Sequence, residues 1–155
     1  PPYDYKGYAK IKEAAGHIPV ASGEAEYTRY GFKELIQNRL VDIIQPDLCK
    51  CGGFYEAKAI SAMAQANNIR ISPHVWGSVV GRAASAHFMA SIPFYPHSLQ
   101  EPEPMMFEYD LGENALRDEI GTAPLSIMEG WLEIEGKPGL GVELDWEKVS
   151  FYTIR

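Results

Sequence analysis

The sequence predicts an α/β fold in which parallel strands alternate with helices. Three strand-like runs, at residues 18–24, 41–47 and 69–75, recur at intervals of about 25 residues with helix-like runs between them, the pattern of parallel strands with right-handed helical crossovers. The runs are apolar or alternate between apolar and polar residues, and each ends near a carboxylate or an imidazole. Both features are typical of βα units that present chemistry where a strand ends.

Helical segments surround these runs. They are predicted at residues 5–16, 27–38, 54–67 and 77–91. The first ends at Gly16, and glycine is common just after a helix. The last is full of small residues, which allow a helix to lie close to a sheet. Four prolines make the next stretch irregular: Pro93, Pro96, Pro102 and Pro104. A fourth strand is expected at 105–109.

The pattern changes from Ala115 onward. Residues 131–134 are predicted to form a strand, residues 137–141 a turn, and residues 145–148 a short helix. No further βα unit is visible in this tail, so we expect it to fold back across the rest of the chain.

Two architectures fit parallel strands with helical crossovers: an open doubly wound sheet and part of a (β/α)₈ barrel. An open sheet of the dinucleotide-binding kind should carry G-x-G-x-x-G after its first strand, and none is present. Functional side chains at the ends of successive strands favour the barrel, but a closed barrel takes about 250 residues. We therefore predict half of a TIM-type barrel in a single partial domain, residues 1–155, with about four βα units in 1–114 and an irregular tail in 115–155.

Composition excludes several classes of protein. The chain has 155 residues, of which 46% are hydrophobic and 23% charged, as in an ordinary globular domain. A net charge of −7 argues against a nucleic-acid partner, and no apolar run approaches the ~20 residues of a membrane span. The two cysteines, Cys49 and Cys51, are one residue apart, so we expect a reducing cytoplasm. The start at Pro1, without methionine, suggests processing, proteolysis or a piece of a longer protein.

Two strand ends form the strongest candidate site. Asp47 and His74 follow neighbouring strands, which lie ~4.8 Å apart, so their side chains can hydrogen-bond. A carboxylate on one imidazole nitrogen fixes the tautomer and favours the other nitrogen as a general base. The alternative is a histidine satisfied by backbone groups. Glu24, on a turn after the first strand, is either a ligand for a hard cation such as Mg²⁺ or a surface carboxylate.

Glu108 is a further candidate at the end of the fourth expected strand. Its apolar neighbours are compatible with a neutral carboxyl that donates a proton to a developing oxyanion, but without the family resemblance described below an outward-facing carboxylate is favoured. A thiol site at Cys49 and Cys51 is a weaker possibility, because no second cysteine pair is present.

Five segments together carry a family resemblance: Ala21–Glu24, Gln45–Gly53, Ser72–Ser78, Phe107–Asp110 and Pro138–Glu143. In this order, and over nearly the whole chain, they resemble the carboxy-terminal half of the mandelate racemase/muconate lactonizing enzyme family, in the enolase superfamily. Muconate-type members place a lysine base where Asp47 stands, so the chain is similar to the mandelate racemase branch.

The resemblance implies a role for each candidate. Glu24 would be the third of three acidic Mg²⁺ ligands, at the end of the fifth barrel strand. Asp47 and His74 would be the dyad of strands six and seven, with His74 as the base. Glu108 would be the acid on strand eight that hydrogen-bonds the substrate carboxylate as it becomes an enediolate.

The implied activity is Mg²⁺-dependent removal of a proton α to a carboxylate, in a sugar-acid dehydratase. The alternatives are a racemase or epimerase of a 2-hydroxy acid, and a non-catalytic half-barrel. The family's capping domain, first barrel half and first two metal ligands are absent. We therefore expect the missing half, or another copy of the chain, to complete the active site. The isolated chain should be inactive, and the complete enzyme is expected to be a homo-oligomer that acts on a small carboxylate.

Overall fold

A sheet of three parallel strands lies at the centre of the chain. The computed structural model describes residues 1–94 and 104–154. The strands are β1 (Ala21–Ser22), β2 (Ile43–Ile44) and β3 (Arg70–Ile71), side by side in chain order. Ser22, Ile44 and Ile71 are in register across the sheet, so the three strands end at the same rim. The predicted α/β organisation is confirmed.

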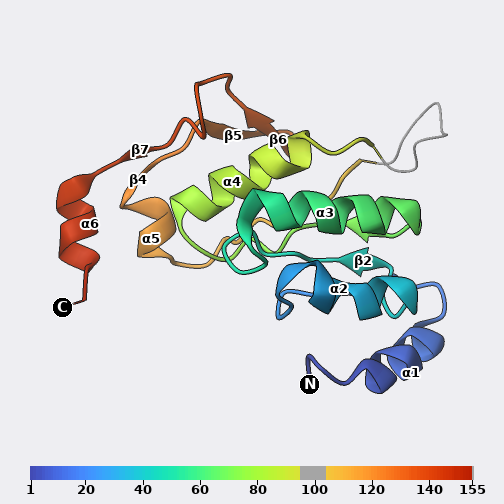
Figure 1. Ribbon diagram of the computed structural model, residues 1–155. Helices are drawn as coiled ribbons and strands as arrows, with labels where there is room; N and C mark the ends of the chain where they lie inside the picture. Colours follow the sequence, from blue (N-terminus) through green and yellow to red (C-terminus); the bar gives the residue numbers. More distant parts are fainter. Residues whose placement is uncertain (95–103, 155) are drawn as a thin grey trace.

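Four helices accompany the sheet and agree with the predicted ones to within two residues at each end. They are α1 (Tyr5–Ala15), α2 (Thr28–Gln37), α3 (Gly53–Ala66) and α4 (Val79–Ala90). Figure 1 shows α2, α3 and α4 stacked in chain order. Side chains cap two of them, since Asp4 accepts from the Gly7 amide and Ser78 from the Gly81 amide. No helix within residues 1–94 and 104–154 is long and apolar enough to cross a membrane.

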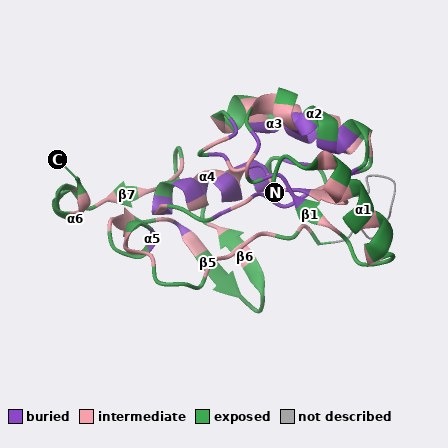
Figure 2. Cartoon of the chain, turned by 90° about the horizontal axis from the view of Figure 1, so that it is seen from below, coloured by how far each residue is buried: buried purple, intermediate pink, exposed green. Residues whose placement is uncertain are grey.

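One apolar core joins the helices to the strands. Its fully buried side chains include Phe32, Leu35 and Ile36 of α2, Ile44 of β2, Ile60 of α3 and Phe88 of α4. Figure 2 shows this buried material on α2, α3 and α4, whereas α6 at the far end of the chain is mostly exposed. Burial of each large side chain contributes about 1.5–3 kcal/mol, so these helices are what hold the sheet in place.

All three strands are shorter than the sequence predicted, and β2 and β3 end early because prolines follow them. Pro46 and Pro73 follow β2 and β3, and a proline has no N–H to continue a hydrogen-bonded ladder. The Gln45 amide donates to the Ser22 carbonyl at 3.0 Å, and the Ser72 amide donates to the Ile44 carbonyl at 3.1 Å. These bonds are the last positions before the prolines at which pairing continues.

The fourth strand expected at 105–109 is absent, and this prediction was wrong. Residues 104–110 form neither helix nor strand, although Met105 lines a cavity together with Ile71 of β3. Pro104 has no N–H to offer, and the Val75 amide beyond β3 is bound by the Glu108 carboxylate instead of a backbone carbonyl. Side chains therefore position this segment. Pro96 and Pro102, in the stretch expected to be irregular, lie outside the described residues.

The tail contains two small antiparallel pairs and two short helices. Its elements are α5 (Ala115–Asp118), β4 (Gly121–Thr122), β5 (Leu125–Met128), β6 (Trp131–Ile134), β7 (Glu143–Leu144) and α6 (Trp146–Tyr152). The strand predicted at 131–134 is confirmed as β6, which pairs with β5, while β4 pairs with β7.

The tail folds back only in part. Trp131 of the β5–β6 hairpin lines one groove together with Met89 of α4 and with Phe107. Figures 1 and 2 both show α6 at the opposite end of the molecule from α1, beyond the β4–β7 pair. Trp131 and Trp146 are 61% and 71% exposed, so the tail leaves large aromatic rings in solvent.

At the other end of the sheet, Asp42 links α1 to the start of the strands. Its carboxylate accepts from the Val20 amide at 3.0 Å and pairs with Lys12 at 3.0 Å. Burial alone would raise the pKa of the Asp42 carboxyl, but the Val20 amide and the Lys12 ammonium outweigh it and hold that pKa below its ordinary value.

We predict that Asp42→Asn lowers the free energy of unfolding by about 1 kcal/mol near neutral pH, since the pair is partly exposed. The folded-state pKa lies below the unfolded one, so the ionised Asp42 stabilises the fold above the unfolded pKa. This stabilisation is lost as pH falls through the folded pKa. The difference between wild type and variant should therefore shrink below about pH 4 in urea unfolding experiments. Glu13→Gln, at an exposed carboxylate with no partner among the described residues, serves as the control. A difference that stays constant through the acid range would contradict the linkage.

Candidate active site

Glu24, Asp47 and His74 lie at one rim because they follow the carboxyl ends of β1, β2 and β3. The strands are parallel and in register, so residues two or three positions beyond the paired ones emerge on the same side of the molecule. Pro46 and Pro73, immediately before Asp47 and His74, are fully buried. A buried proline with fixed φ anchors the backbone from which each functional side chain extends.

The expected hydrogen bond between Asp47 and His74 is present. His74 Nδ1 and Asp47 Oδ2 are 2.9 Å apart, and the two side chains are 23% and 17% exposed. The second Asp47 oxygen, Oδ1, accepts from the Cys49 amide at 2.7 Å, which fixes the carboxylate plane. With Nδ1 bound to a carboxylate, Nε2 is the ring atom left to exchange a proton with a ligand. The arrangement can therefore act as a general base with a defined tautomer.

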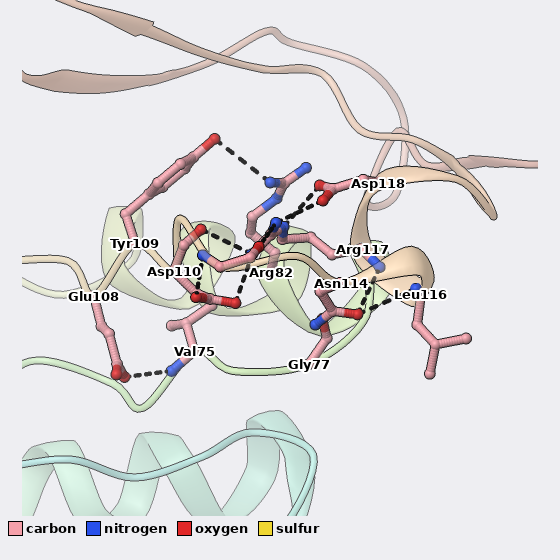
Figure 3. Close-up of polar contacts among 11 residues, drawn as sticks. Val75, Gly77, Arg82, Glu108, Tyr109, Asp110, Asn114, Leu116, Arg117 and Asp118 are labelled. Carbon is pink, nitrogen blue, oxygen red and sulfur yellow. Dashed lines mark hydrogen bonds and ion pairs between the residues drawn. The ribbon is translucent and has the colours of Figure 1, made fainter.

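Glu108 is turned toward the same rim, although it is not on a strand. Its Oε2 accepts from the Val75 amide at 2.7 Å, which places the carboxylate beside the residue that follows His74 (Figure 3). Met105 and Phe107 pack against the core and anchor the chain before it. The structure thus brings a second carboxylate to the dyad from a segment about thirty residues further along the chain.

Glu24 is at the rim but stands alone. It is exposed, on a turn after Gly23, and makes no hydrogen bond or ion pair within residues 1–94 and 104–154. Among those residues, no group of three or more His, Cys, Asp or Glu side chains could hold a metal ion. Glu24 has the oxygen chemistry that suits Mg²⁺, yet the described part of the chain does not assemble a complete site around it.

The dyad opens into a hollow of only about 30 Å³, lined also by Cys49 and Trp76. Trp76 is 68% exposed, so its ring forms an open edge of this hollow. A larger groove of about 450 Å³ lies elsewhere, between α4 and the β5–β6 hairpin, and its walls are mostly apolar. We place the candidate site at the dyad because the groups capable of acid–base chemistry converge there.

The thiol alternative is not supported by the environment of the cysteines. Cys51 is fully buried, and burial, aided by the Asp47 charge, raises the pKa of its thiol to about 11. Burial also raises the pKa of the Cys49 thiol, again with a contribution from Asp47. Because the thiolate is the nucleophile and the metal ligand, these raised pKa values mean that the surroundings activate neither thiol.

Two features of the rim escaped the sequence analysis. Glu26 is a buried carboxylate two residues after Glu24, and burial raises its pKa, although the Tyr5 hydroxyl donates to it at 3.0 Å. Burial and this bond raise the pKa of Tyr5 to about 12. The second feature is Arg117, buried in α5 among carboxylates. An Asn at 114 before Ala-Leu-Arg-Asp is a helix-start signal that identifies α5, but nothing local reveals the burial of its arginine.

The carboxylate–imidazole pair lies at the ends of parallel strands, with Glu24 and Glu108 at the same rim. This is where α/β barrel enzymes place their acid–base groups. The chain belongs to the enolase C-terminal domain-like family, whose model matches residues 1–149. The resemblance to the mandelate racemase/muconate lactonizing enzyme family is thereby confirmed.

The relatives are enzymes or enzyme-like proteins. D-galactarolactone cycloisomerase of Agrobacterium fabrum is 40% identical over 153 residues, which cover 99% of this chain and 40% of that protein. The crystal structure of 3,6-anhydro-D-galactonate cycloisomerase from Zobellia galactanivorans matches with a TM-score of 0.87 and 37% identity, over 100% of this chain and 41% of that one. A mandelate racemase/muconate lactonizing enzyme-like protein from Rubrobacter xylanophilus matches with a TM-score of 0.79 and 31% identity, over 100% and 37% of the two chains. The chain thus spans about two fifths of the length of these relatives.

Gly23 sets the turn that presents Glu24. Its φ is +127°, and an added Cβ would lie 2.8 Å from the Phe32 ring and 3.2 Å from the Gln45 amide nitrogen. We predict that Gly23→Ala lowers the free energy of unfolding by about 2–4 kcal/mol, because backbone strain and overpacking of a buried ring add together. Chemical denaturation followed by circular dichroism measures the change. Gly136→Ala is the matched control, since its added Cβ meets nothing within 4 Å and no positive φ is involved. Equal stability of the two variants would contradict this account of the turn.

Proposed function

We propose that this chain supplies the base and the acid of an enzyme that removes the proton α to a substrate carboxylate and then expels the oxygen on the β-carbon. The observation that supports it most directly is the 2.9 Å contact between His74 Nδ1 and Asp47 Oδ2 at the ends of adjacent parallel strands. It leaves Nε2 as a base of fixed orientation at a rim where a ligand can approach.

The chemistry assigns a task to each group. His74 Nε2 takes the α-proton, and Asp47 stabilises the imidazolium that forms. The electron pair of the broken C–H bond enters the carboxylate, which becomes an enediolate with two negative charges. In its protonated form, Glu108 would donate a hydrogen bond from Oε1, the oxygen that Val75 does not bind, to the substrate carboxylate and so stabilise part of the charge that develops there. The β C–O bond then breaks, and the leaving oxygen receives the proton that His74 holds.

Glu24 would provide one of the carboxylate ligands of Mg²⁺. Exposure and the lack of a partner among the described residues leave both of its oxygens available to a hard cation. When bound, the cation supplies electrostatic stabilisation of the charge that builds on the substrate carboxylate. A single carboxylate does not hold Mg²⁺ on its own, so the other acidic ligands would come from outside this chain.

We infer that β1, β2 and β3 are consecutive strands of a (β/α)₈ barrel, and that residues outside this chain complete the site. The hollow at the dyad holds about one water molecule, whereas pockets for small ligands have about 300–1,000 Å³. The walls that enclose a substrate are thus missing from the described residues. The length of the relatives, to which this chain contributes about two fifths, fits a complete enzyme with a first barrel half and a capping domain. The isolated chain should bind and turn over nothing.

The two cycloisomerase relatives support a sugar acid as substrate and a ring oxygen as the leaving group. In a 3,6-anhydro-hexonate the oxygen on C3 lies β to the carboxylate and also closes the ring, so its elimination opens the ring. A dehydratase, which the sequence alone favoured, performs the same elimination on a free hydroxyl. Other solved structures among the matches carry the provisional names dehydratase and mandelate racemase. The first chemical step is common to all of these reactions.

We predict that His74→Asn in the complete enzyme slows exchange of the substrate α-proton with D₂O by a factor of at least about 10², because the proposed base is removed. Proton NMR of the substrate measures the exchange. His17→Asn is the matched control, since His17 is exposed near the opposite end of β1 and should leave exchange unchanged. Undiminished exchange in His74→Asn would exclude His74 as the base. A wild-type enzyme with neither exchange nor turnover would favour a non-catalytic role.

A panel of substrates separates ring opening from dehydration. We expect the complete enzyme to consume D-galactarolactone or 3,6-anhydro-D-galactonate with a kcat/KM at least about tenfold above that for acyclic D-galactonate, a discrimination within the reach of ordinary pocket contacts. NMR identifies the products. A preference for the acyclic acid would instead support a dehydratase. Inversion at the α-carbon without elimination would indicate a racemase or epimerase.

A further inference from the structure

We propose that Arg117 is a positioning residue for Glu108: its guanidinium holds the chain that follows Glu108 and so keeps the Glu108 carboxylate at the backbone of Val75, beside His74. The inference rests on the acid role proposed for Glu108.

Arg117 is buried, with 8% of its surface exposed, and its side chain meets an acceptor at every nitrogen (Figure 3). Nε donates to Asp118 Oδ1 at 2.7 Å, and Nη2 donates to Asp118 Oδ2 and to the Gly112 carbonyl, both at 2.5 Å. Nη1 donates to the Asp110 carbonyl at 2.8 Å and to Asp110 Oδ2 at 2.6 Å. Five contacts match the five N–H groups of a guanidinium, which gives the clamp a fixed geometry.

Three of the five contacts of Arg117 are to groups that lie shortly after Glu108 in the chain. Asp110 and Gly112 are two and four residues further on. Both accept hydrogen bonds from Arg117 through their backbone carbonyls, and Asp110 also accepts one through its carboxylate. Residues 104–110 form no strand, so no sheet ladder fixes this segment. The contacts to Arg117 therefore replace the hydrogen bonds that a strand would have provided.

The clamp is itself tied to the dyad. Asn114 caps α5 by accepting from the amides of Leu116 and Arg117, and its Nδ2 donates to the Gly77 carbonyl at 3.0 Å. Gly77 lies three residues after His74, so this hydrogen bond holds the start of α5 next to the loop that carries His74. Arg117 thus connects a helix fixed on the His74 loop to the chain that carries Glu108.

A second arginine contributes on the other side but more weakly. Arg82 of α4 donates to the Tyr109 hydroxyl at 3.4 Å, and its guanidinium lies 5.6 Å from the centre of the Tyr109 ring. This contact orients Tyr109 without binding the backbone next to Glu108. The bidentate and carbonyl contacts of Arg117 are the ones that determine where the chain runs.

The test is a double-mutant cycle in the complete enzyme with Arg117→Ala and Glu108→Gln. A misplacement of about 1 Å can cost about 10² in rate, so Arg117→Ala should lower kcat for α-proton removal by about tenfold to a hundredfold. In the Glu108→Gln background the same change should cost less than about threefold, because no acid remains to be positioned. An equal loss in both backgrounds would show a general structural effect and overturn the proposal.

Hydrogen–deuterium exchange tests the clamp independently of activity. The Val75 amide should exchange faster in Arg117→Ala, since its acceptor is no longer held, and unchanged protection would overturn the proposal. If Glu108→Gln alone leaves kcat unchanged, the proposed acid role fails, while the exchange experiment still reports on the clamp. The two failures are thereby distinguishable.

Two further variants keep the test decisive. Arg117→Lys retains a positive charge between Asp110 and Asp118 but loses the planar guanidinium. It replaces Arg117→Ala in the double-mutant cycle if the alanine variant does not fold. Asp42→Asn destabilises the opposite end of the sheet and is the control for destabilisation alone. It should alter kcat equally, by less than about twofold, in the wild-type and Glu108→Gln backgrounds.

Discussion

The parallel register of β1, β2 and β3 is the constraint on which the candidate site depends. Ser22, Ile44 and Ile71 are paired across the sheet, and the contact between Asp47 and His74 follows from that alignment. A slip of one residue would turn every side chain of a strand to the other face and separate the pair. The core formed by α2, α3 and α4 therefore acts on the chemistry indirectly, by excluding such slips.

The rim combines two ways of holding a functional group. Asp47 and His74 extend from strand ends that buried prolines anchor, so secondary structure determines their position. Glu108 extends from a segment without secondary structure, and a hydrogen bond from the Val75 amide positions its carboxylate. A group held by side-chain and amide contacts is more easily displaced than one held by a ladder, which makes its supporting residues part of the site.

The sequence pattern predicted the features that depend on local interactions. All four long helices, the β6 strand and the Asp47–His74 pair could be derived from patterns and spacing, because amphipathic repeats and strand ends are written locally in the chain. The prediction of a fourth strand was wrong, because a strand forms only if its backbone pairs with a neighbouring strand. Pro104 offers no N–H, and the Glu108 carboxylate occupies the Val75 amide beyond β3. The hydrogen-bond partners of Arg117 lie within seven residues of it, but α5 packs against α4, far earlier in the chain, and no local pattern reveals this burial. The local sequence likewise does not show that Glu24 lacks a partner among the described residues. The roles assigned to these residues remain proposals.

The three tryptophans have a spectroscopic consequence. Trp76, Trp131 and Trp146 are between 61% and 71% exposed, so their emission in the folded chain already resembles that of indole in water. Loss of the fold changes their surroundings little, and fluorescence is a poor reporter of it. The same rings become sensitive labels for association, because any protein surface that covers them would move their emission toward the blue. The three rings would thus report optically on the binding of another chain at these positions.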